Sequence, residues 1–441
     1  MASTDTRVRA KTFKTADVMR AAMPPAGPVK ILMASHSHPQ LSKGGSEIAA
    51  FELFTALKSR TEYEPWFLGC VRDPAQQKLG ATLSQPFSER EYLYSAGAFD
   101  WFKFANQDPK FPGEFRELLK HLQPQIVHFH HYLNLGVEAF LHVREVLPQC
   151  RIILTLHEYL AMCHHYGQMV TKQSRSLCHE SSPTRCAGCF EEHAAADFFL
   201  RNQYIRRFFD LVDHFIAPSH FLAERYIAWG IEPSRMSVVE NVIMPTIGEV
   251  RKPRHGRDLL RIGVFGQISL LKGINVLFET ADLLQERKID HIVFEIHGDY
   301  RGQPPEFQED FLKRMAKARL NLSFHGAYDQ QRVDGLMQSM DLIVVPSIWW
   351  ENSPVVIQEA LRNRRPVICS DIGGMAEKVR DGVDGFHFPV GSAPALASLL
   401  VRLADSHTAL SEVATTLRTP ELVDEVVDRH LKLYASSVTA N

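Results

Sequence analysis

The segment from Asp341 to Glu377 constrains the fold more than any other part of the chain. It holds two short apolar runs, Leu342 to Pro346 and Pro366 to Ser370, and a stretch with helical character follows each run. Apolar runs of this length between helices are typical of strands that are buried in a parallel sheet. The order strand, acidic loop, helix, strand, Gly-Gly loop, helix therefore predicts an α/β fold.

The same alternation of strands and helices runs through the rest of the chain in two series. Such alternation predicts doubly wound parallel sheets, whose ligands bind in a crevice at the carboxyl ends of the strands. We therefore predict two Rossmann-like domains that face a central cleft. The predicted parts are a disordered tail (1–28), an N-terminal acceptor-side domain (29–244) with a cysteine-rich insertion (158–200), a linker (245–259), a C-terminal donor domain (260–420) and a helix (421–441) that crosses back to the N-terminal domain.

Composition excludes several classes of protein. The formal net charge of −2 over 441 residues gives no basic footprint for nucleic acid. No apolar run approaches the roughly 18 residues that a membrane-spanning helix needs. Seven cysteines in a chain of this length do not make a disulfide scaffold, and the N-terminus has no apolar core of a secretory signal. We therefore predict a protein of the reducing cytoplasm.

Two carboxylates flank the start of the helix that follows Pro346. Glu351 precedes this helix, whereas Glu359 lies about two turns inside it. Carboxylates bind the hydroxyls of a sugar or ribose well, because each accepts charge-assisted hydrogen bonds. The two acids can thus reach different parts of one extended ligand. The competing interpretation is a capped helix with two solvated acids.

The start of the same helix has the residues of a capped N-terminus. Ser353 or Asn352 suits the cap, Pro354 suits the first helical turn, and Val355 follows. The unpaired N–H groups of such a helix start can receive a diphosphate.

A second loop, from Gly266 to Gly273, joins a predicted strand to a helix that we expect to start near Lys272. A lysine at this place can neutralise a diphosphate that leaves during a reaction. The competing interpretation is an ordinary turn with a surface lysine.

Two features of the first series also point towards the cleft. Gly44 and Gly45 precede a helix, and a glycine pair lets the backbone approach a ligand closely. His157 follows the predicted strand Ile152 to Leu156, where it can bind a sugar hydroxyl or carry a proton near neutral pH. Either feature is also compatible with a purely structural role, as a tight turn or as one of 21 histidines.

The pattern that contains Glu351, Glu359 and Gly373-Gly374 resembles the donor-binding signature of the retaining glycosyltransferases of family four, which have the GT-B fold. The resemblance runs from about Val29 to the C-terminus and is strongest from Arg261 to Phe388. It implies transfer of a sugar from a nucleotide diphosphate sugar to an acceptor hydroxyl, with retention of configuration and without a covalent nucleophile. Gln267 departs from the family, which usually has an arginine there. The resemblance implies catalytic roles for His157, Lys272 and Glu351, and donor binding by Gly44, Gly45, Gln267, Glu351, Asn352, Ser353, Pro354, Val355, Glu359, Gly373 and Gly374.

The resemblance also sets expectations for partners. Lys272 and helix N-termini would stabilise the leaving diphosphate, so no cofactor is required for catalysis. The acceptor would be a glycan, a lipid-linked glycan or a small molecule, in polysaccharide or glycoconjugate biosynthesis, with the enzyme in the cytoplasm or peripheral at the inner membrane. One rival, a sugar phosphorylase, calls for a lysine-bound pyridoxal cofactor, of which the sequence gives no sign. Another rival is a non-catalytic nucleotide-sugar sensor or scaffold, which would bind the donor without consuming it.

Four of the cysteines fall close together after His157. Four thiolates suit a tetrahedral zinc ion, and the last two form a Cys-x-x-Cys pair. An iron–sulfur cluster fits the same number of ligands, and unpaired thiols or a disulfide are the further alternatives. The candidate ligands of a structural zinc are Cys163, Cys178, Cys186 and Cys189, with His164, His165 and His179 as spare ligands.

Overall fold

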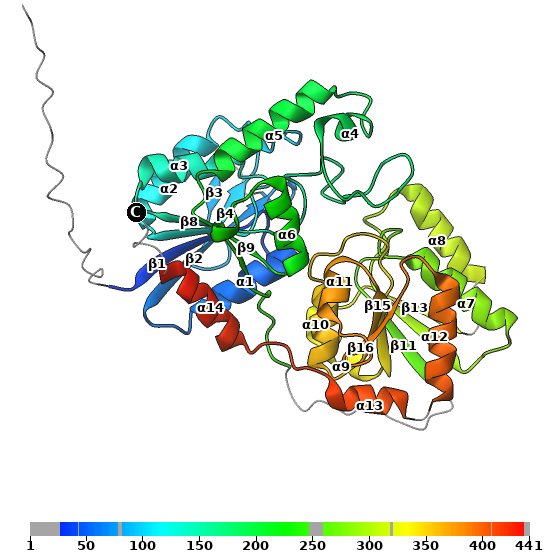
Figure 1. The fold of residues 1–441 in the computed structure, drawn as a ribbon. Helices are drawn as coiled ribbons and strands as arrows, with labels where there is room; N and C mark the ends of the chain where they lie inside the picture. Colours follow the sequence, from blue (N-terminus) through cyan, green and yellow to red (C-terminus); the bar gives the residue numbers. More distant parts are fainter. Residues whose placement is uncertain are drawn as a thin grey trace, which may run out of the picture.

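The computed structural model describes residues 27–42, 44–77, 82–246, 259–317, 321–406 and 408–435. In these residues the chain forms two large sheets, each with helices on both faces (Figure 1). The predicted α/β fold with two Rossmann-like units is confirmed. Most of the predicted tail (1–28) and linker (245–259) lies outside the described residues, and the limits of the domains stay a prediction.

The first sheet has the strand order β10-β9-β8-β7-β1-β2-β4-β3, and its strands are parallel except for β3. Alternate residues of β1 pack into different hydrophobic clusters, with Leu32 on one face and Ile31 on the other. A strand that is buried on both faces needs a continuous apolar sequence, which β1 has. The strands are β1 (Val29–Ala34), β2 (Tyr63–Val71), β3 (Leu83–Ser84), β4 (Glu91–Ser95), β7 (Ile126–Phe129), β8 (Arg151–Thr155), β9 (His214–Ala217) and β10 (Met236–Val238).

The helices around the first sheet include the last helix of the described chain, α14. Figure 1 shows α14 beside α1, and the Tyr434 hydroxyl lies 2.7 Å from His128 Nδ1 of strand β7. The elements here are α1 (Gly45–Leu57), α2 (Phe111–Leu122), α3 (Ala139–Val146), α4 (Pro183–Ala187), α5 (Ala195–Phe209), α6 (His220–Trp229), a 3-10 turn (Pro233–Arg235), α14 (Val423–Ala435) and the hairpin β5 (Phe99–Asp100) and β6 (Ala105–Asn106).

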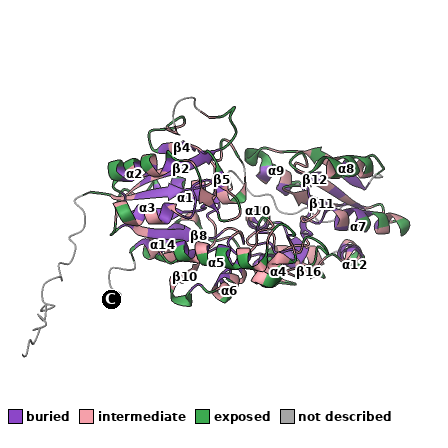
Figure 2. Ribbon diagram, turned by 90° about the horizontal axis from the view of Figure 1, so that it is seen from above, coloured by how far each residue is buried: buried purple, intermediate pink, exposed green. Residues whose placement is uncertain are grey.

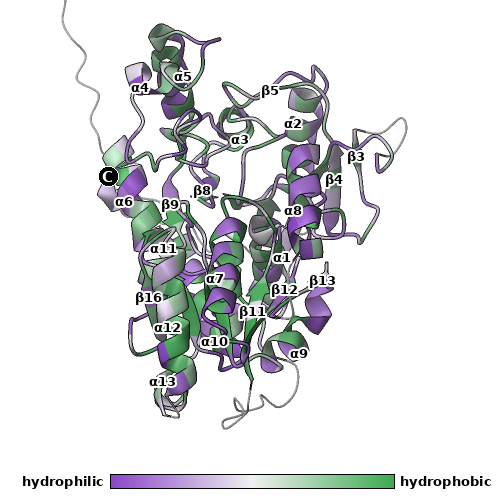
Figure 3. Cartoon of the chain, turned by 90° about the vertical axis from the view of Figure 1, so that its right-hand side faces the viewer, coloured by the Kyte–Doolittle hydropathy of each residue, from purple (hydrophilic) through white to green (hydrophobic). Residues whose placement is uncertain are grey.

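The second sheet is parallel throughout, with the order β13-β12-β11-β14-β15-β16. Most of this sheet is coloured as hydrophobic in Figure 3 and as buried in Figure 2, but the edge strand β13 has exposed residues. The helices show exposed residues on their outer sides. The elements are β11 (Leu260–Phe265), α7 (Ile274–Glu286), β12 (Ile292–His297), α8 (Pro305–Lys317), β13 (Leu322–Gly326), a 3-10 turn (Gln330–Arg332), α9 (Val333–Gln338), β14 (Leu342–Val345), α10 (Val355–Arg362), β15 (Val367–Ser370), α11 (Gly373–Lys378), β16 (Gly385–Phe388), α12 (Ala393–Asp405) and α13 (Ala409–Thr416).

The chain reverses its direction of winding between β11 and β14, which are neighbours in the second sheet. Ligands of open α/β sheets bind at such a switch point, outside the carboxyl ends of the two strands. The loops that follow β11 and β14 are therefore the place to look for a site. In the described residues, no helix is long and apolar enough to cross a membrane.

Candidate donor-binding site

The carboxylate of Glu351 is held through one of its two oxygens. Oε1 accepts hydrogen bonds from Lys272 Nζ at 2.6 Å, Ser347 Oγ at 2.7 Å and Trp349 Nε1 at 2.8 Å. Within the described part of the chain, no hydrogen bond to Oε2 is recorded. Since Glu351 is only 6% exposed, its position is fixed, and Oε2 remains able to accept a hydrogen bond from a ligand hydroxyl.

Lys272 reaches Glu351 from the loop after β11, on the other side of the switch point. Helix α7 begins at Ile274, two residues after Lys272, near which its start was predicted. Gly273 has a φ of +79°, and a Cβ there would lie 1.8 Å from the Pro346 carbonyl oxygen. Only glycine lets this loop pack so closely on the end of β14. This contact places the ammonium of Lys272 beside Glu351, 5.4 Å from the centre of the Trp349 ring.

The Gly373-Gly374 pair packs directly on the loop that carries Glu351. Gly374 N–H donates to the Glu351 carbonyl at 2.8 Å. A Cβ on Gly374 would lie 1.6 Å from the Asn352 carbonyl oxygen, and Gly373 has a φ of +59°. The glycine pair is therefore needed to bring α11 against the Glu351 loop.

Replacement of Gly374 by alanine is expected to destabilise the protein by about 1–3 kcal/mol, because its Cβ meets backbone rather than a flexible side chain. Thermal unfolding of Gly374→Ala measures the effect. The matched control is Gly335→Ala in α9, where a Cβ has nothing within 4 Å and alanine favours the helix. A Gly374→Ala protein as stable as the control would contradict the packing described.

The predicted cap of α10 is wrong. Pro354 is the N-cap residue itself and α10 starts at Val355, without a side-chain cap. Asn352 Oδ1 instead accepts a hydrogen bond from Ser219 Oγ at 3.0 Å, and Ser353 Oγ donates to Glu240 Oε1 at 2.7 Å. Both side chains thus bind the first half of the chain. The N–H of Ile357 donates to the Pro354 carbonyl at 3.0 Å, whereas those of Val355 and Val356, in the first turn of α10, can bind a ligand.

Further contacts join the two halves beside this loop. Glu377 accepts hydrogen bonds from the N–H groups of His220 at 2.9 Å and Phe221 at 2.8 Å, at the start of α6. Figure 1 shows α6 and α11 side by side. Lys378 forms an ion pair with Glu240. The Glu351 loop is therefore held between the two sheets.

Glu359 lies inside α10 and is 4% exposed. Burial raises the pKa of its carboxyl to about 7, against a hydrogen bond from Gln330 and the charge of Arg362, which lower it. The sequence analysis did not single out Gln330, because nothing in a polar stretch marks one glutamine as a partner of a distant acid.

The first half of the chain presents its glycine pair to the start of α10. A Cβ on Gly45 would lie 3.7 Å from a methyl group of Val355. Next to the pair, Glu47 lies 3.3 Å from His36 Nε2. Burial alone would raise the pKa of Glu47, but hydrogen bonding and charge interaction with His36 outweigh it and lower the pKa to about 2. A charged, fixed carboxylate thus adjoins Gly44 and Gly45.

His157 lies two residues beyond β8, and its Nε2 is 3.1 Å from His130 Nδ1. Burial and the nearby His36 lower the pKa of His157 to about 3, although the charge of Glu47 acts in the opposite direction. The imidazole is therefore neutral near pH 7, which suits a hydrogen bond to a ligand better than proton transfer.

Gln267 is exposed in the loop after β11. A Cβ on Gly302 would lie 3.8 Å from its Nε2. The structure places Gln267 on the same loop as Lys272 but records no contact with Glu351. Ser347 and Trp349, which hold Glu351, were not predicted as site residues, although the sequence places Trp349 two residues before it.

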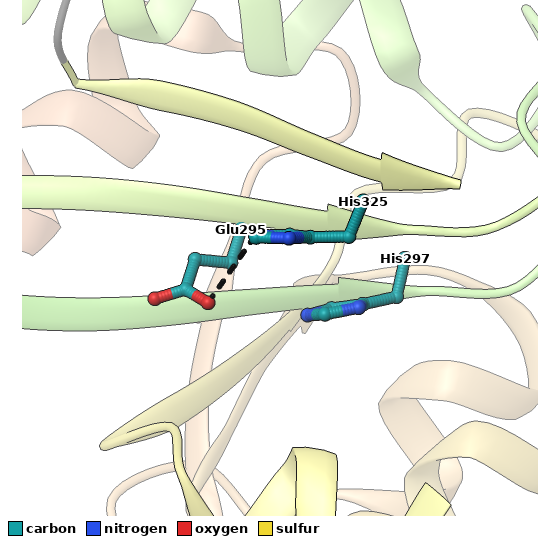
Figure 4. A group of neighbouring side chains, drawn as sticks. All are labelled: Glu295, His297 and His325. Carbon is teal, nitrogen blue, oxygen red and sulfur yellow. Dashed lines mark ion pairs between the residues drawn. The ribbon is translucent and has the colours of Figure 1, made fainter. Parts of the chain in front are cut away.

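Glu295, His297 and His325 form a second group of polar side chains, on β12 and β13 (Figure 4). Their ligand atoms lie within 4.8 Å of one another. The two imidazole rings are stacked, with centroids 4.5 Å apart and planes 11° apart. A metal ion must lie in the plane of each imidazole that binds it, which two stacked rings do not allow. Glu295 also forms an ion pair with Arg261, in which Nη2 lies 2.5 Å from Oε1. We therefore assign no metal to this group.

The four cysteines of the insertion form no disulfide. Cys163 and Cys178 pack at the edge of the hydrophobic cluster that contains Leu32 of β1. Cys186 lies in α4, and Cys189 lies two residues after its end. Cys70, Cys150 and Cys369 are buried; Cys70 lies in β2, Cys369 lies in β15 and Cys150 directly precedes β8.

Models of two protein families match the chain, one on each half. The model described as "Glycosyltransferase Family 4" matches residues 43–246, and the model described as "Glycosyl transferases group 1" matches residues 249–413. Together they include every described strand of the two sheets except β1.

Curated relatives match part of the chain. The phosphatidyl-myo-inositol mannosyltransferase of Mycobacterium leprae is 30% identical over 152 residues, 34% of this chain and 38% of that protein. The alpha-D-kanosaminyltransferase of Streptomyces kanamyceticus is 28% identical over 155 residues, 35% of this chain and 39% of that protein. The matched regions thus span about two fifths of the length of these relatives.

Solved structures match nearly the whole chain. Anabaena Alr3699/HepE in complex with UDP and glucose has a TM-score of 0.63 and 15% identity, covering 93% of this chain and 100% of that one. Sucrose-phosphate synthase of Thermosynechococcus elongatus has a TM-score of 0.68 and 16% identity, covering 92% of this chain and 98% of that one. At this level of identity the similarity establishes the fold.

Proposed function

Because the chain belongs to family 4 of the glycosyltransferases and has their GT-B fold, we propose that it transfers a sugar from a nucleotide diphosphate sugar to an acceptor hydroxyl. The observation that carries the proposal is the placement of Glu351. Its carboxylate is fixed by Lys272 across the switch point of the second sheet. It also precedes the open start of α10, which adjoins Gly45 of the first half. A carboxylate, an ammonium and a helix N-terminus in one place suit a sugar that is attached to a diphosphate.

The second half would bind the donor. Glu359 would accept hydrogen bonds from the ribose, while Glu351 and the Gly373-Gly374 loop hold the sugar. Lys272 and the start of α10 would stabilise the diphosphate as it leaves, so the reaction would need no divalent cation. The exposed amide of Gln267 can donate one hydrogen bond to a phosphate but brings no charge.

The first half would supply the acceptor side. His157, neutral at pH 7, would bind a hydroxyl of the donor sugar, and Gly44 and Gly45 would allow close approach at its reacting end. The acceptor hydroxyl would attack from the face that the phosphate leaves, so the configuration is retained and no covalent nucleophile is required. Closure of the cleft would exclude water and limit hydrolysis of the donor.

We propose a hexose as the transferred sugar and a glycan, a lipid-linked glycan or a small molecule as the acceptor. Two relatives support this choice by their names, the mannosyltransferase of phosphatidyl-myo-inositol and an amylovoran biosynthesis glycosyltransferase of Erwinia amylovora. We therefore propose a role in polysaccharide or glycoconjugate biosynthesis, with the protein in the cytoplasm or peripheral at the inner membrane.

Calorimetric titration with a panel of nucleoside diphosphates tests the donor site. We expect one nucleotide to bind more tightly than the others, and Glu359→Ala to weaken it. Glu279→Ala, on the exposed side of α7, is the control that should bind like the wild type. Absence of binding by every nucleotide would contradict the proposal. A non-catalytic sensor would bind a nucleotide sugar without releasing the sugar, so turnover of the donor separates that alternative.

Binding of the nucleotide sugar should depend on pH through Glu359. Ribose hydroxyls donate to the ionised carboxylate, so the ligand favours the deprotonated form. With a pKa of about 7 in the free protein, affinity should be full above this pH and fall up to about tenfold per unit below it. Titrations between pH 6 and 8 measure the trend, and Glu359→Gln should abolish it. If the affinity of Glu359→Gln depended on pH as that of the wild type does, Glu359 would not be the group that binds the ligand.

A further inference from the structure

The insertion between β8 and α5 is a long segment with little secondary structure of its own. It contains the short helix α4 and a single antiparallel bridge between Val170 and Leu177. Its first part packs into the core of the first sheet through residues such as Tyr159, Met162 and Met169, but none of residues 171–189 is buried. A segment without buried apolar residues often depends on a metal or on disulfides. Its four cysteines form no disulfide.

Backbone hydrogen bonds bring two of the cysteines to the same residue. Cys178 N–H donates to the Met169 carbonyl at 2.7 Å. The backbone N–H groups of the same Met169 and of His165 lie close to the Cys163 sulfur and favour its thiolate. Cys163 and Cys178 therefore lie on either side of one turn of the chain.

The Cys-x-x-Cys pair is folded against that turn. Cys189 N–H donates to the Cys186 carbonyl at 3.0 Å, which closes the loop between the two. Gln173 Nε2 donates to the Gly188 carbonyl at 2.6 Å and ties this loop to the segment with the Val170 bridge. These contacts bring the backbone segments that carry the four cysteines, which are 26 positions apart at most in the sequence, next to one another.

A buried positive charge, that of Arg201, lies near these thiols. The carboxyl of Glu158 interacts with this charge, but burial raises the pKa of that carboxyl to about 8, so it is largely protonated at pH 7. Arg201 is 2% exposed and donates to the carbonyls of Phe102, Leu160 and Ala161. In the described ranges, no carboxylate lies within ion-pair distance of it. Cys163 and Cys186 are among the groups that interact with its charge. A zinc ion with four thiolates carries a net charge of −2, which would compensate the guanidinium.

Three histidines lie in the same segment as the cysteines. His165 Nδ1 lies 2.8 Å from the Val170 carbonyl oxygen, and the rings of His164 and His179 pack on aromatic neighbours. The sulfur atoms are spread wider than in a loaded site, since no three of them lie within 4.8 Å of one another. Zinc–sulfur bonds of about 2.3 Å would draw them to roughly 3.8 Å apart.

The segment also touches the loop that carries Glu351. Trp350 Nε1 donates to the Cys178 carbonyl at 3.0 Å, and its ring packs 5.2 Å from His179 and 5.2 Å from Phe221. Trp350 is 7% exposed and belongs to the hydrophobic cluster of the first half, although it comes from the second. The backbone of Cys178 thus helps to fix the residue next to Glu351.

We propose that Cys163, Cys178, Cys186 and Cys189 bind one structural zinc ion, and that this ion holds the insertion in the shape that receives Trp350 and positions Glu351. The proposed zinc site does not depend on the proposed function. Its effect on donor binding through Trp350 and Glu351 does rest on that function.

Metal analysis of the full chain, purified under reducing conditions, tests the zinc site. We expect one zinc per chain, and its loss in Cys186→Ser/Cys189→Ser. Cys150→Ala, outside the insertion, is the matched control and should keep the metal. Should the double variant fail to fold, replacement of the wild-type metal by cobalt gives a second test through thiolate-to-cobalt charge-transfer bands. The proposal would be overturned if the purified protein contained no zinc. It would also be overturned by a disulfide between these cysteines, detected by mass spectrometry, or by the visible absorbance of an iron–sulfur cluster.

Trp350→Phe tests the coupling to the donor site. This variant should keep its zinc and its fold, but lose the hydrogen bond to Cys178 and show a donor KM that is raised up to about tenfold. An unchanged KM would overturn the positioning role, while the zinc content would still decide the metal site. Failure of the wild type to bind any nucleotide would contradict the proposed function without affecting the zinc result.

Discussion

Glu351→Gln is expected to lower kcat/KM for the nucleotide sugar about 10²–10³-fold while leaving the fold intact. The amide has the same shape but no charge, and it replaces one acceptor oxygen by a donor. The three groups that hold Glu351 all bind Oε1, so a glutamine can keep them through its own oxygen. Its NH₂ group would then face the ligand at the place where Oε2 of the glutamate accepts a hydrogen bond from a hydroxyl. The loss falls in the range seen when one preorganised polar group is removed from an active site.

Steady-state kinetics with the preferred donor, together with thermal unfolding, measure this effect. Glu279→Gln, an exposed acid of the same half of the chain, is the control and should behave like the wild type. A Glu351→Gln enzyme with wild-type turnover would remove Glu351 from the site, and a grossly unfolded one would show that its role is structural.

Lys272→Ala is expected to lower kcat by about 10²–10³-fold and to weaken binding of the nucleoside diphosphate. The ammonium lies 2.6 Å from Glu351 and is the cation that the loop after β11 brings to the switch point. A leaving diphosphate gains negative charge in the transition state, so the lysine should contribute more there than in the ground state. Lys272→Arg keeps the charge and should recover part of the activity.

Lys272 and Glu351 should also contribute to catalysis as a coupled pair. Because Lys272 and Glu351 share a hydrogen bond, the double variant should lose less activity than the two single losses predict together. Kinetics of the wild type, both single variants and the double variant give the coupling. Full additivity, or a Lys272→Ala enzyme with unchanged kcat, would contradict a shared role at the diphosphate.

The sequence was sufficient to predict the fold because its strands are continuous apolar runs. The runs at Ile31 and Leu342 lie in strands β1 and β14, which are buried on both faces. The order of strands and helices then predicts that Lys272 and Glu351 lie at one edge of a sheet. The contact between the two, however, depends on Gly273 and Pro346, whose close approach is a property of the packed loop.

Local propensity failed where the two halves of the chain meet. Ser353 and Asn352 have the side chains of helix caps, but Glu240 and Ser219 bind them instead. A contact between residues more than a hundred positions apart thus replaced a local one. The same holds for Trp350, whose partner, the Cys178 carbonyl, no pattern in the sequence identifies.

The central claim is that the site around Glu351 binds and consumes a nucleotide sugar. The most direct measurement is the release of nucleoside diphosphate from a panel of nucleotide sugars, by the wild type and by Glu351→Gln in parallel. We predict sustained release from one donor by the wild type, faster with a suitable acceptor, and a rate about 10²–10³-fold lower in the variant. Release from no donor, or equal rates in the two proteins, would contradict the account.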